Sequence, residues 1–278
     1  MADPLLSVNG LAVTTVGGEP VVSDIGFSVG PGQIVGVVGE SGSGKSVTCK
    51  AILGLLPQGL QIGAGDINLA GHHVLTYGFD EWRSLRGSLI AAVFQDPGSY
   101  LNPSVPVGRQ LATALRVRYG LRRREAAARA QELLTELGLG PESGAAAKLP
   151  RELSGGMLQR SVLAIALSGR PALLIADEVT TALDVSVQSE VLQVLSARRD
   201  ATGMSVVFVS HDLAVVSSIC DTVLVMRDGG IVESGATAAV LRNPQHPYTR
   251  LLIDEHRRYG IERYTTSEDA DEPRYATA

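Results

Sequence analysis

A glycine-rich loop between two apolar segments constrains this chain more than any other feature. The loop GESGSGKS, residues 39–46, follows the β-branched run GQIVGVVGE (32–40) and precedes the helical pattern SVTCKAILGLL (46–56), which Pro57 ends. It matches the spacing G-x-x-x-x-G-K-[ST], in which a loop between a buried strand and a helix holds phosphate groups. The alternative, a glycine-rich turn with a surface lysine, does not require this strand–loop–helix context. The segment therefore predicts an α/β fold built around a nucleotide.

Each residue type in this phosphate-binding loop has a physical role. Glycines let the backbone wrap the phosphates, and the amides of residues 42–46 point inward at the N-terminus of the helix. Lys45 is expected to reach the β- and γ-phosphates of ATP, and Ser46 to ligate Mg²⁺. The residues that the motif assigns to nucleotide binding are Gly39, Ser41, Gly42, Ser43, Gly44, Lys45 and Ser46.

Alternating strand and helix patterns indicate a mostly parallel sheet. Apolar, β-rich runs occur at 89–95, 171–178 and 204–212, and the segment 222–235 has the pattern of a hairpin that turns at Asp228-Gly229-Gly230. A helix with an apolar face that includes Val191 and Leu195 follows the second run. Strands that alternate with helices are typical of a parallel sheet covered on both faces.

Two stretches depart from this alternation. Residues 96–165 are rich in helical patterns and lack a buried-strand pattern, so we expect a helical subdomain inserted there. Its clearest helix, at 124–138, has apolar residues on one face: Ala126, Ala130, Leu133, Leu134 and Leu137. Residues 259–278 are acidic and polar and predict a loosely ordered tail after a domain at 1–258.

Polar residues follow three of the apolar runs. Asp177 and Glu178 end ALLIADE, where Asp177 is expected to hold Mg²⁺ through water and Glu178 to polarise the attacking water. The alternative is that the two carboxylates cap the next helix. Gln95 follows LIAAVF, and His211 follows SVVFVS. Taken singly, each is more often a loop residue, but both fall at the carboxyl ends of strands, where α/β sheets bind ligands.

Composition argues against several other classes of protein. The chain has 278 residues, 45% of them hydrophobic, and a net charge of -5, which is unfavourable for coating DNA or RNA. No apolar run reaches the ~18 residues of a membrane span, and the N-terminus MADPLLSVNG has no pattern of a signal peptide. Cys49 and Cys220 are expected to be buried thiols in a reducing cytosol.

A second glycine motif, LSGGMLQR at 153–160, identifies a family. Together with GESGSGKS, Gln95, LLIADE, TALD (181–184) and His211, it resembles the nucleotide-binding subunits of ABC transporters over about residues 5–245. The resemblance implies a P-loop NTPase (RecA-like) fold with an added antiparallel β subdomain. It also implies a head-to-tail pair in which each ATP lies between the phosphate-binding loop of one subunit and the LSGG segment of the other.

The resemblance carries roles over to particular residues. Ser154, Gly155 and Gly156 are expected to bind the γ-phosphate of the partner's ATP, and Asp184 to reach across the pair. Gln95 is expected to sense Mg²⁺ and His211 to contact the γ-phosphate. The loop DPGSYLNP (96–103) would then lie where a permease docks. The expected partners are a second ATP-binding subunit, identical or related, transmembrane permease subunits and, indirectly, an extracytoplasmic substrate-binding protein, at the cytoplasmic face of the inner membrane.

Finer features indicate a subfamily and its departures. LSGGMLQR together with NPQHPYTRLL (243–252) is similar to the ATP-binding subunits of peptide and nickel importers, and the ending RRYGIERY leans toward the nickel or metallophore branch. Val179 stands where the family has a proline, and Val16 stands where an aromatic stacks on adenine, which leaves the preference for ATP over GTP open. The chain lacks the C-terminal cysteine cluster of some peptide importers, so we expect no iron–sulfur centre.

Other P-loop proteins remain as alternatives. A non-transport ABC ATPase acting on nucleic acid or ribosomes is disfavoured by the single cassette, the absence of a heptad run and the negative charge. A P-loop kinase or other phosphotransferase leaves LSGGMLQR and TALD without a role. The sequence therefore predicts an ATPase subunit of a peptide or nickel importer.

Overall fold

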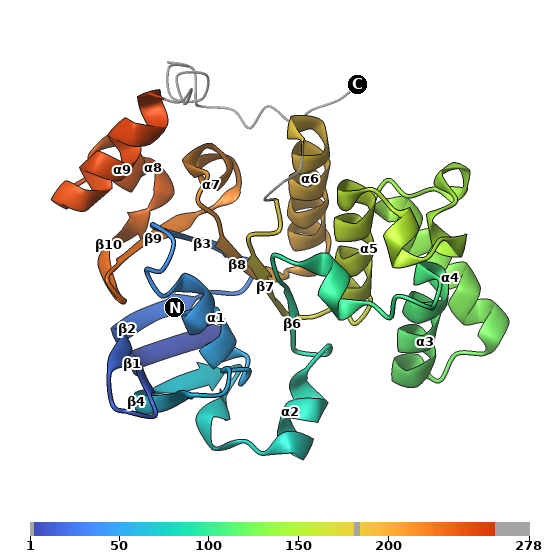
Figure 1. The fold of residues 1–278 in the computed structure, drawn as a ribbon, viewed down its shortest axis with the longest axis horizontal. Coiled ribbons are helices and arrows are strands. Elements are labelled where there is room, and N and C mark those ends of the chain that lie inside the picture. The colour runs from blue at the N-terminus through green and yellow to red at the C-terminus, as the bar shows by residue number, and fades with distance from the viewer. Residues whose placement is uncertain (1–2, 181–183, 259–278) are drawn as a thin grey trace.

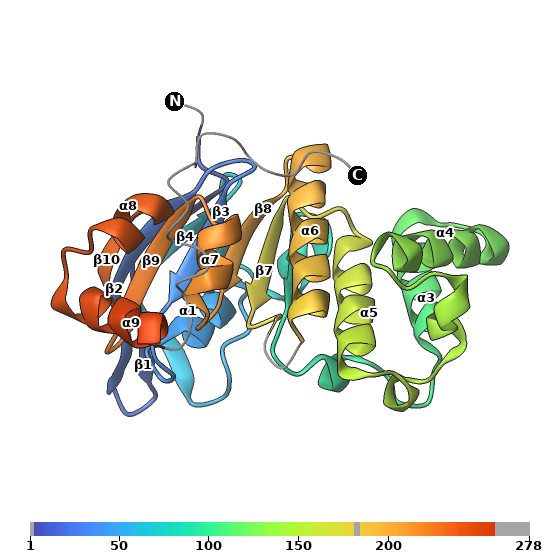
Figure 2. The same ribbon diagram turned by 90° about the horizontal axis from the view of Figure 1, so that it is seen from above.

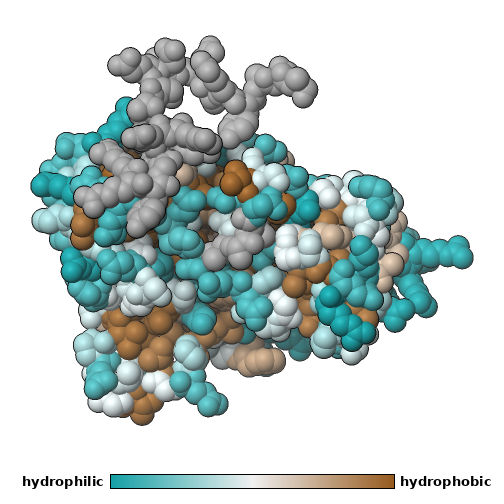
Figure 3. Space-filling view, turned by 45° about the horizontal axis from the view of Figure 1, so that its top comes forward, coloured by the Kyte–Doolittle hydropathy of each residue, from teal (hydrophilic) through white to brown (hydrophobic). Residues whose placement is uncertain are grey.

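The computed structural model describes residues 3–180 and 184–258, which form a broad lobe and a narrower helical lobe (Figure 1). The space-filling view shows the narrower lobe projecting to the right, with hydrophobic areas on this face broken up by hydrophilic side chains (Figure 3). The predicted tail at 259–278 and residues 181–183 of TALD lie outside the described residues.

The central sheet has the strand order β10-β9-β3-β8-β7-β6. Its strands are β3 (Ile34–Val38), β6 (Ile90–Val93), β7 (Leu173–Asp177), β8 (Ser205–Val209), β9 (Thr222–Arg227) and β10 (Gly230–Ala236). Neighbouring strands from β9 through β3, β8 and β7 to β6 are parallel, and β10 pairs with β9 as an antiparallel hairpin. The structure thus confirms the predicted strands and the mostly parallel sheet.

A second sheet, of order β2-β1-β4-β5, is antiparallel. Its strands are β1 (Leu6–Thr15), β2 (Pro20–Val29), β4 (Leu60–Leu69) and β5 (His72–His73). Only the family resemblance predicted this subdomain. Its long strands bury one face and expose the other, and register shifts in the β1 pairings disturb the simple alternation that marks a strand in sequence.

The helices lie on both sides of the parallel sheet and in the second lobe (Figures 1 and 2). They are α1 (Lys45–Ile52), α2 (Phe79–Leu85), α3 (Val107–Tyr119), α4 (Arg123–Glu136), α5 (Gly155–Leu167), α6 (Val185–Thr202), α7 (Leu213–Ile219), α8 (Thr237–Arg242) and α9 (Pro247–Arg258). Helices α3, α4 and α5 occupy the stretch expected to be helical, and the predicted apolar face of α4 is buried. Helix α1 ends earlier than predicted because Gly54 has a φ of 64° and a Cβ there would lie 2.5 Å from Trp82.

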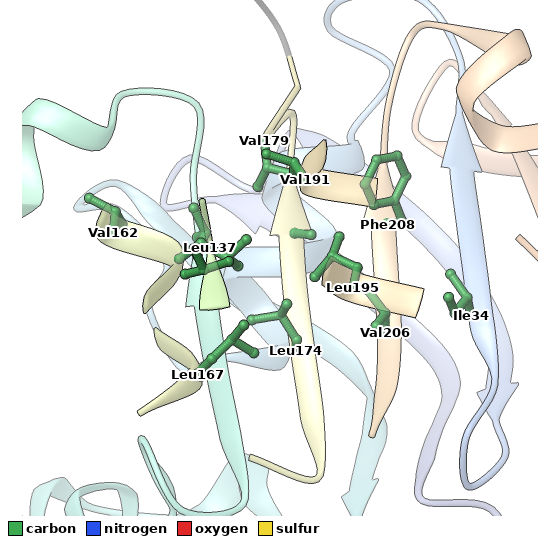
Figure 4. Packing of buried hydrophobic residues seen from close by; sticks show 14 of the residues in the cluster. Ile34, Leu137, Val162, Leu167, Leu174, Val179, Val191, Leu195, Val206 and Phe208 are labelled. Carbon is green, nitrogen blue, oxygen red and sulfur yellow. The ribbon is translucent and has the colours of Figure 1, made fainter. Parts of the chain in front are cut away.

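The core divides into two clusters because successive residues of each central strand face opposite sides of the sheet. On β8, Val206 and Phe208 belong to the cluster beneath α5, α6 and α7, whereas Val207 and Val209 face α1 and the antiparallel sheet. Figure 4 shows side chains of α5 and α6 packed on β7 and β8 in the first cluster. Cys49 and Cys220 are buried free thiols, as expected. The two clusters pack on opposite faces of the parallel sheet, and this packing fixes the positions of the strand ends.

Candidate nucleotide site

The candidate catalytic residues meet at one edge of the parallel sheet. The phosphate-binding loop follows β3, Glu178 follows β7, His211 follows β8, and Gln95 follows β6. Since β6, β7, β8 and β3 are parallel neighbours, their carboxyl ends lie along the same edge. The structure therefore places along one edge of the sheet the residues that the sequence placed at strand ends.

The phosphate-binding loop is closed tightly against the strand beside it. Gly39 has a φ of 148°, and a Cβ at this position would lie 2.1 Å from the backbone oxygen of Met226 at the end of β9. Only glycine fits such a conformation at such a distance. The Lys45 side chain is buried, and its Nζ donates hydrogen bonds to the carbonyl oxygens of Gly39 at 2.8 Å and Glu40 at 2.7 Å. The loop is thus ordered around its own lysine.

A hydroxyl and a carboxylate join this loop to β7. Ser46 Oγ donates a hydrogen bond to Asp177 Oδ1 at 3.2 Å, although the two residues are far apart in sequence. Burial raises the pKa of the Asp177 carboxyl, and the hydrogen bond from Ser46 opposes this shift. Burial also lowers the pKa of Lys45, against the attraction of the Glu178 and Asp177 carboxylates. Paired hard oxygen atoms of this kind suit Mg²⁺, so the residues present fit that ion.

Glu178 has an unusual backbone for a residue with a side chain. Its φ is 53°, and its N–H donates to the Val209 carbonyl oxygen at 3.0 Å, which ties it to the end of β8. A non-glycine residue in the left-handed region is costly and often occurs at functional sites. The side chain is half-buried, while Val179 next to it is 1% exposed. Val179, which stands where the resemblance expects a proline, therefore packs into the core, and the Glu178 carboxylate remains at the end of β7.

The LSGG segment lies elsewhere. Ser154, Gly155 and Gly156, here called the signature loop, begin α5, which packs against β6, α3 and α4, whereas α1 packs against β1 and β7. Ser154 and Gly155 are exposed, and Ser154 Oγ accepts a hydrogen bond from the Met157 amide at 3.3 Å. Within the part of the chain that the structure describes, a Cβ built on Gly155 meets no atom within 4 Å. The phosphate-binding loop and the signature loop are thus held by different parts of the fold (Figures 1 and 2).

Asp184 lies beside the signature loop. It caps α6, and its Oδ1 accepts hydrogen bonds from the Val187 amide at 2.9 Å and from Ser186 Oγ at 2.6 Å. These bonds lower the pKa of its exposed carboxyl. A Cβ on Gly156 would lie 2.9 Å from Val187, so the first turns of α5 and α6 pack closely. The structure therefore groups Asp184 with the signature loop.

Comparisons with known proteins decide the family. Residues 22–181 match the family model described as ABC transporter. The chain is 43% identical over 267 residues to the probable D,D-dipeptide transport ATP-binding protein DdpD of Escherichia coli (strain K12), covering 95% of this chain and 81% of that protein. It is 39% identical to the dipeptide transport ATP-binding protein DppD of Lactococcus lactis subsp. cremoris, over 91% of this chain and 73% of that protein. This chain belongs to the ABC transporter family.

Solved ABC cassettes share the fold. A dimeric, post-hydrolysis structure of the ATP-binding cassette MJ0796 bound to ADP and Pi has a TM-score of 0.75 and 25% identity, covering 84% of this chain and 98% of that one. The cassette cbiO1 from Clostridium perfringens, part of the transporter complex cbiONQ, has a TM-score of 0.76 and 27% identity, over 87% of this chain and 92% of that one. The ABC chain described here is an ATPase with the P-loop NTPase fold that the resemblance predicted.

Val16, in the turn after β1, is 71% exposed, so its side chain is open to contact but offers no aromatic ring. Among residues 3–180 and 184–258, no helix combines the length and the apolar character that crossing a bilayer requires.

Sequence reasoning missed one contact at the phosphate-binding loop, a hydrogen bond from the Glu40 amide to the Tyr248 hydroxyl at 3.0 Å. No pattern in the sequence signals the partner of the Tyr248 hydroxyl.

Proposed function

We propose that this chain is the ATP-hydrolysing subunit of an ABC importer for peptides. It acts in head-to-tail pairs on transmembrane permease subunits at the cytoplasmic face of the cell membrane. One observation carries the proposal. Ser43, Gly44 and Lys45 of the phosphate-binding loop are buried, and Lys45 bonds the loop's own carbonyl oxygens, whereas Ser154 and Gly155 of the signature loop are exposed and held in a different part of the fold. Two half-sites so placed are used together when a second subunit supplies the missing half to each.

The residues at the phosphate-binding loop and at the end of β7 have different roles in ATP binding and hydrolysis. Lys45 leaves the carbonyl oxygens of Gly39 and Glu40 and binds the β- and γ-phosphates of ATP. Ser46 and Asp177 would hold Mg²⁺, which supplies charge neutralisation at the phosphates when it is bound. Glu178 orients and polarises the attacking water as a general base.

The remaining candidate residues complete this site from both subunits. Gln95 and His211 follow β6 and β8 at the same edge of the sheet, and we assign them roles at Mg²⁺ and the γ-phosphate respectively. Ser154, Gly155 and Gly156 bind the γ-phosphate of the partner's ATP at the N-terminus of α5, where backbone amides and the helix dipole favour an anion. Asp184 lies at the start of the adjacent helix and reaches across the pair.

The chemistry of the cargo is proposed from the relatives. DdpD and DppD are named for dipeptide transport, and they share 43% and 39% identity with this chain over most of its length. The segment NPQHPYTRLL, which is similar to that of peptide and nickel importers, forms the start of α9 and the turn before it. Nickel or a metallophore is the other cargo that this resemblance allows.

The test is to purify the full chain with its membrane partners and assay the complex. A tagged copy, expressed in its own cells and recovered from solubilised membranes, is expected to bring down multi-span permease chains. Reconstituted with the associated binding protein, the complex should hydrolyse ATP faster with dipeptides than with Ni²⁺ salts. Stimulation by Ni²⁺ alone would assign the nickel branch. Recovery with nucleic acid or ribosomes and without a membrane protein would overturn the proposal.

A further inference from the structure

The C-terminal helix α9 meets the phosphate-binding loop through one buried tyrosine. Tyr248, in the first turn of α9, is 2% exposed, and its hydroxyl accepts a hydrogen bond from the backbone amide of Glu40 at 3.0 Å. The Arg227 guanidinium, at the end of β9, lies 4.8 Å from the centroid of the Tyr248 ring. Burial raises the pKa of this phenol, so the hydroxyl stays neutral. Residues distant in sequence therefore converge behind the loop.

The backbone of Glu40 is held from two sides. Its carbonyl oxygen accepts a hydrogen bond from Lys45 Nζ at 2.7 Å, on the side where the proposed function places the nucleotide. Its amide is held by Tyr248 from the opposite end of the chain. When Lys45 turns to the phosphates, Gly39 and Glu40 lose the bonds that this lysine makes to them. The bond to Tyr248 does not involve Lys45, so it can persist in both states.

Helix α9 is itself fixed at both ends. At its start, the Glu233 carboxylate of β10 accepts hydrogen bonds from the amides of Gln245 at 2.7 Å and His246 at 3.0 Å. Near its other end, His256 Nε2 lies 2.5 Å from the carbonyl oxygen of His211, the residue that follows β8 at the site edge. The helix also buries Leu252 and Ile253 in the core. These contacts fix the position of α9, and therefore the position of the Tyr248 side chain that it carries.

We propose that Tyr248 is a positioning residue for ATP binding. Its hydroxyl keeps the Glu40 amide in place, so that the phosphate-binding loop retains its shape when Lys45 transfers its hydrogen bonds to the nucleotide. The proposal rests on the nucleotide-binding role of Lys45 given above. It assigns to the HPY segment (246–248) a role in nucleotide affinity, in addition to packing. Tyr248 does not touch the reacting atoms, so its loss affects binding more than the chemical step.

The test uses the full chain with Tyr248→Phe, which keeps the ring beneath Arg227 and removes only the hydroxyl. The dissociation constant for a non-hydrolysable ATP analogue with Mg²⁺ is expected to rise about fivefold, the effect of one net hydrogen bond. The KM for ATP should rise by the same factor, with kcat unchanged. An unchanged dissociation constant, or a fall in kcat at constant KM, would overturn the proposal.

Tyr119→Phe is the matched control. The Tyr119 hydroxyl donates to the Ser168 carbonyl oxygen at 3.1 Å, in the helical lobe, so this variant also loses one hydroxyl–backbone bond. Both variants are expected to lower the melting temperature of the nucleotide-free chain slightly, but only Tyr248→Phe should weaken nucleotide binding. Equal weakening of binding in both variants would reduce Tyr248 to a general structural role.

Two further measurements keep the outcome interpretable. Lys45→Ala is expected to abolish binding of the analogue. If it does and Tyr248→Phe binds normally, only the positioning role fails; if Lys45→Ala binds like the wild type, the nucleotide site itself is wrong. Hydrogen exchange on the wild-type chain with bound analogue should show a protected Glu40 amide. Exchange at the unprotected rate would overturn the proposal even if Tyr248→Phe does not fold.

Discussion

The phosphate-binding loop and the signature loop have similar composition, but their first glycines, Gly39 and Gly155, lie in different environments. Both contain serine and glycine at the start of a helix. A methyl group at Gly39 would overlap the Met226 backbone, whereas a methyl group at Gly155 meets no atom of the described residues within 4 Å. Glycine is needed at Gly39 by this subunit. At Gly155 no described residue of this subunit excludes a side chain, and this open space is where we propose that the partner's nucleotide binds.

The largest expected effect comes from Glu178, which belongs to the first loop's half of the site. Glu178→Gln should preserve ATP binding but lower kcat by ~10²-fold or more, as for loss of a general base. Steady-state phosphate release and equilibrium binding of ATP measure the two quantities. Near-normal turnover would remove Glu178 from this role.

The pairing of the two loops can be tested with linked copies of the chain. When Lys45→Ala is on one copy and Ser154→Arg on the other, both changes fall in the same composite site, so one intact site should still occlude ATP. When both changes are on the same copy, each site is damaged and no ATP should be occluded. Counting occluded nucleotide per linked pair separates the outcomes. The reverse pattern would mean that each subunit builds its site alone.

Alanine at the two glycines tests the difference in environment directly. Gly39→Ala forces the loop and β9 apart, which should cost ~2 kcal/mol and lower the melting temperature of the nucleotide-free chain by about 6 °C. Gly155→Ala should leave that temperature unchanged but weaken ATP-dependent pairing about tenfold, because the methyl group meets the partner's nucleotide. Calorimetry and sedimentation measure the two effects. A large loss of stability in Gly155→Ala would contradict the open environment described for it.

The smallest expected shifts in melting temperature concern polar side chains at each loop. Asp177→Asn removes a carboxylate whose pKa burial raises, so the nucleotide-free chain should melt at a higher temperature while Mg²⁺-dependent ATP binding is lost. Ser154→Ala removes an N-cap worth about 1 kcal/mol and should lower the melting temperature by about 3 °C. Thermal melts with and without Mg-ATP provide the measurement. A lower melting temperature for Asp177→Asn would show that this carboxylate stabilises the empty site.

The sequence predicted the parallel sheet and its polar strand ends because buried parallel strands are nearly continuous apolar runs. Segments such as GQIVGVVGE stand out for that reason. It marked β1, β2 and β4 poorly, because an antiparallel sheet with one exposed face mixes polar and apolar residues and β1 pairs with shifts in register. Motif spacing placed Lys45, Ser46 and Asp177 in one site, and the structure shows the Ser46–Asp177 contact. The left-handed backbone of Glu178 and the hydroxyl of Tyr248 on Glu40 depend on tertiary packing, so no local pattern signals them.

The contact between α9 and the phosphate-binding loop has a consequence for exchanging parts between related subunits. A chimera that replaces residues after 236 with the C-terminal segment of another ABC ATPase would exchange the group that holds the Glu40 amide. It would exchange the support beneath the His211 backbone as well. Altered ATP hydrolysis in such hybrids would then originate in the nucleotide site, even where the graft was intended to change only which permease the subunit recognises.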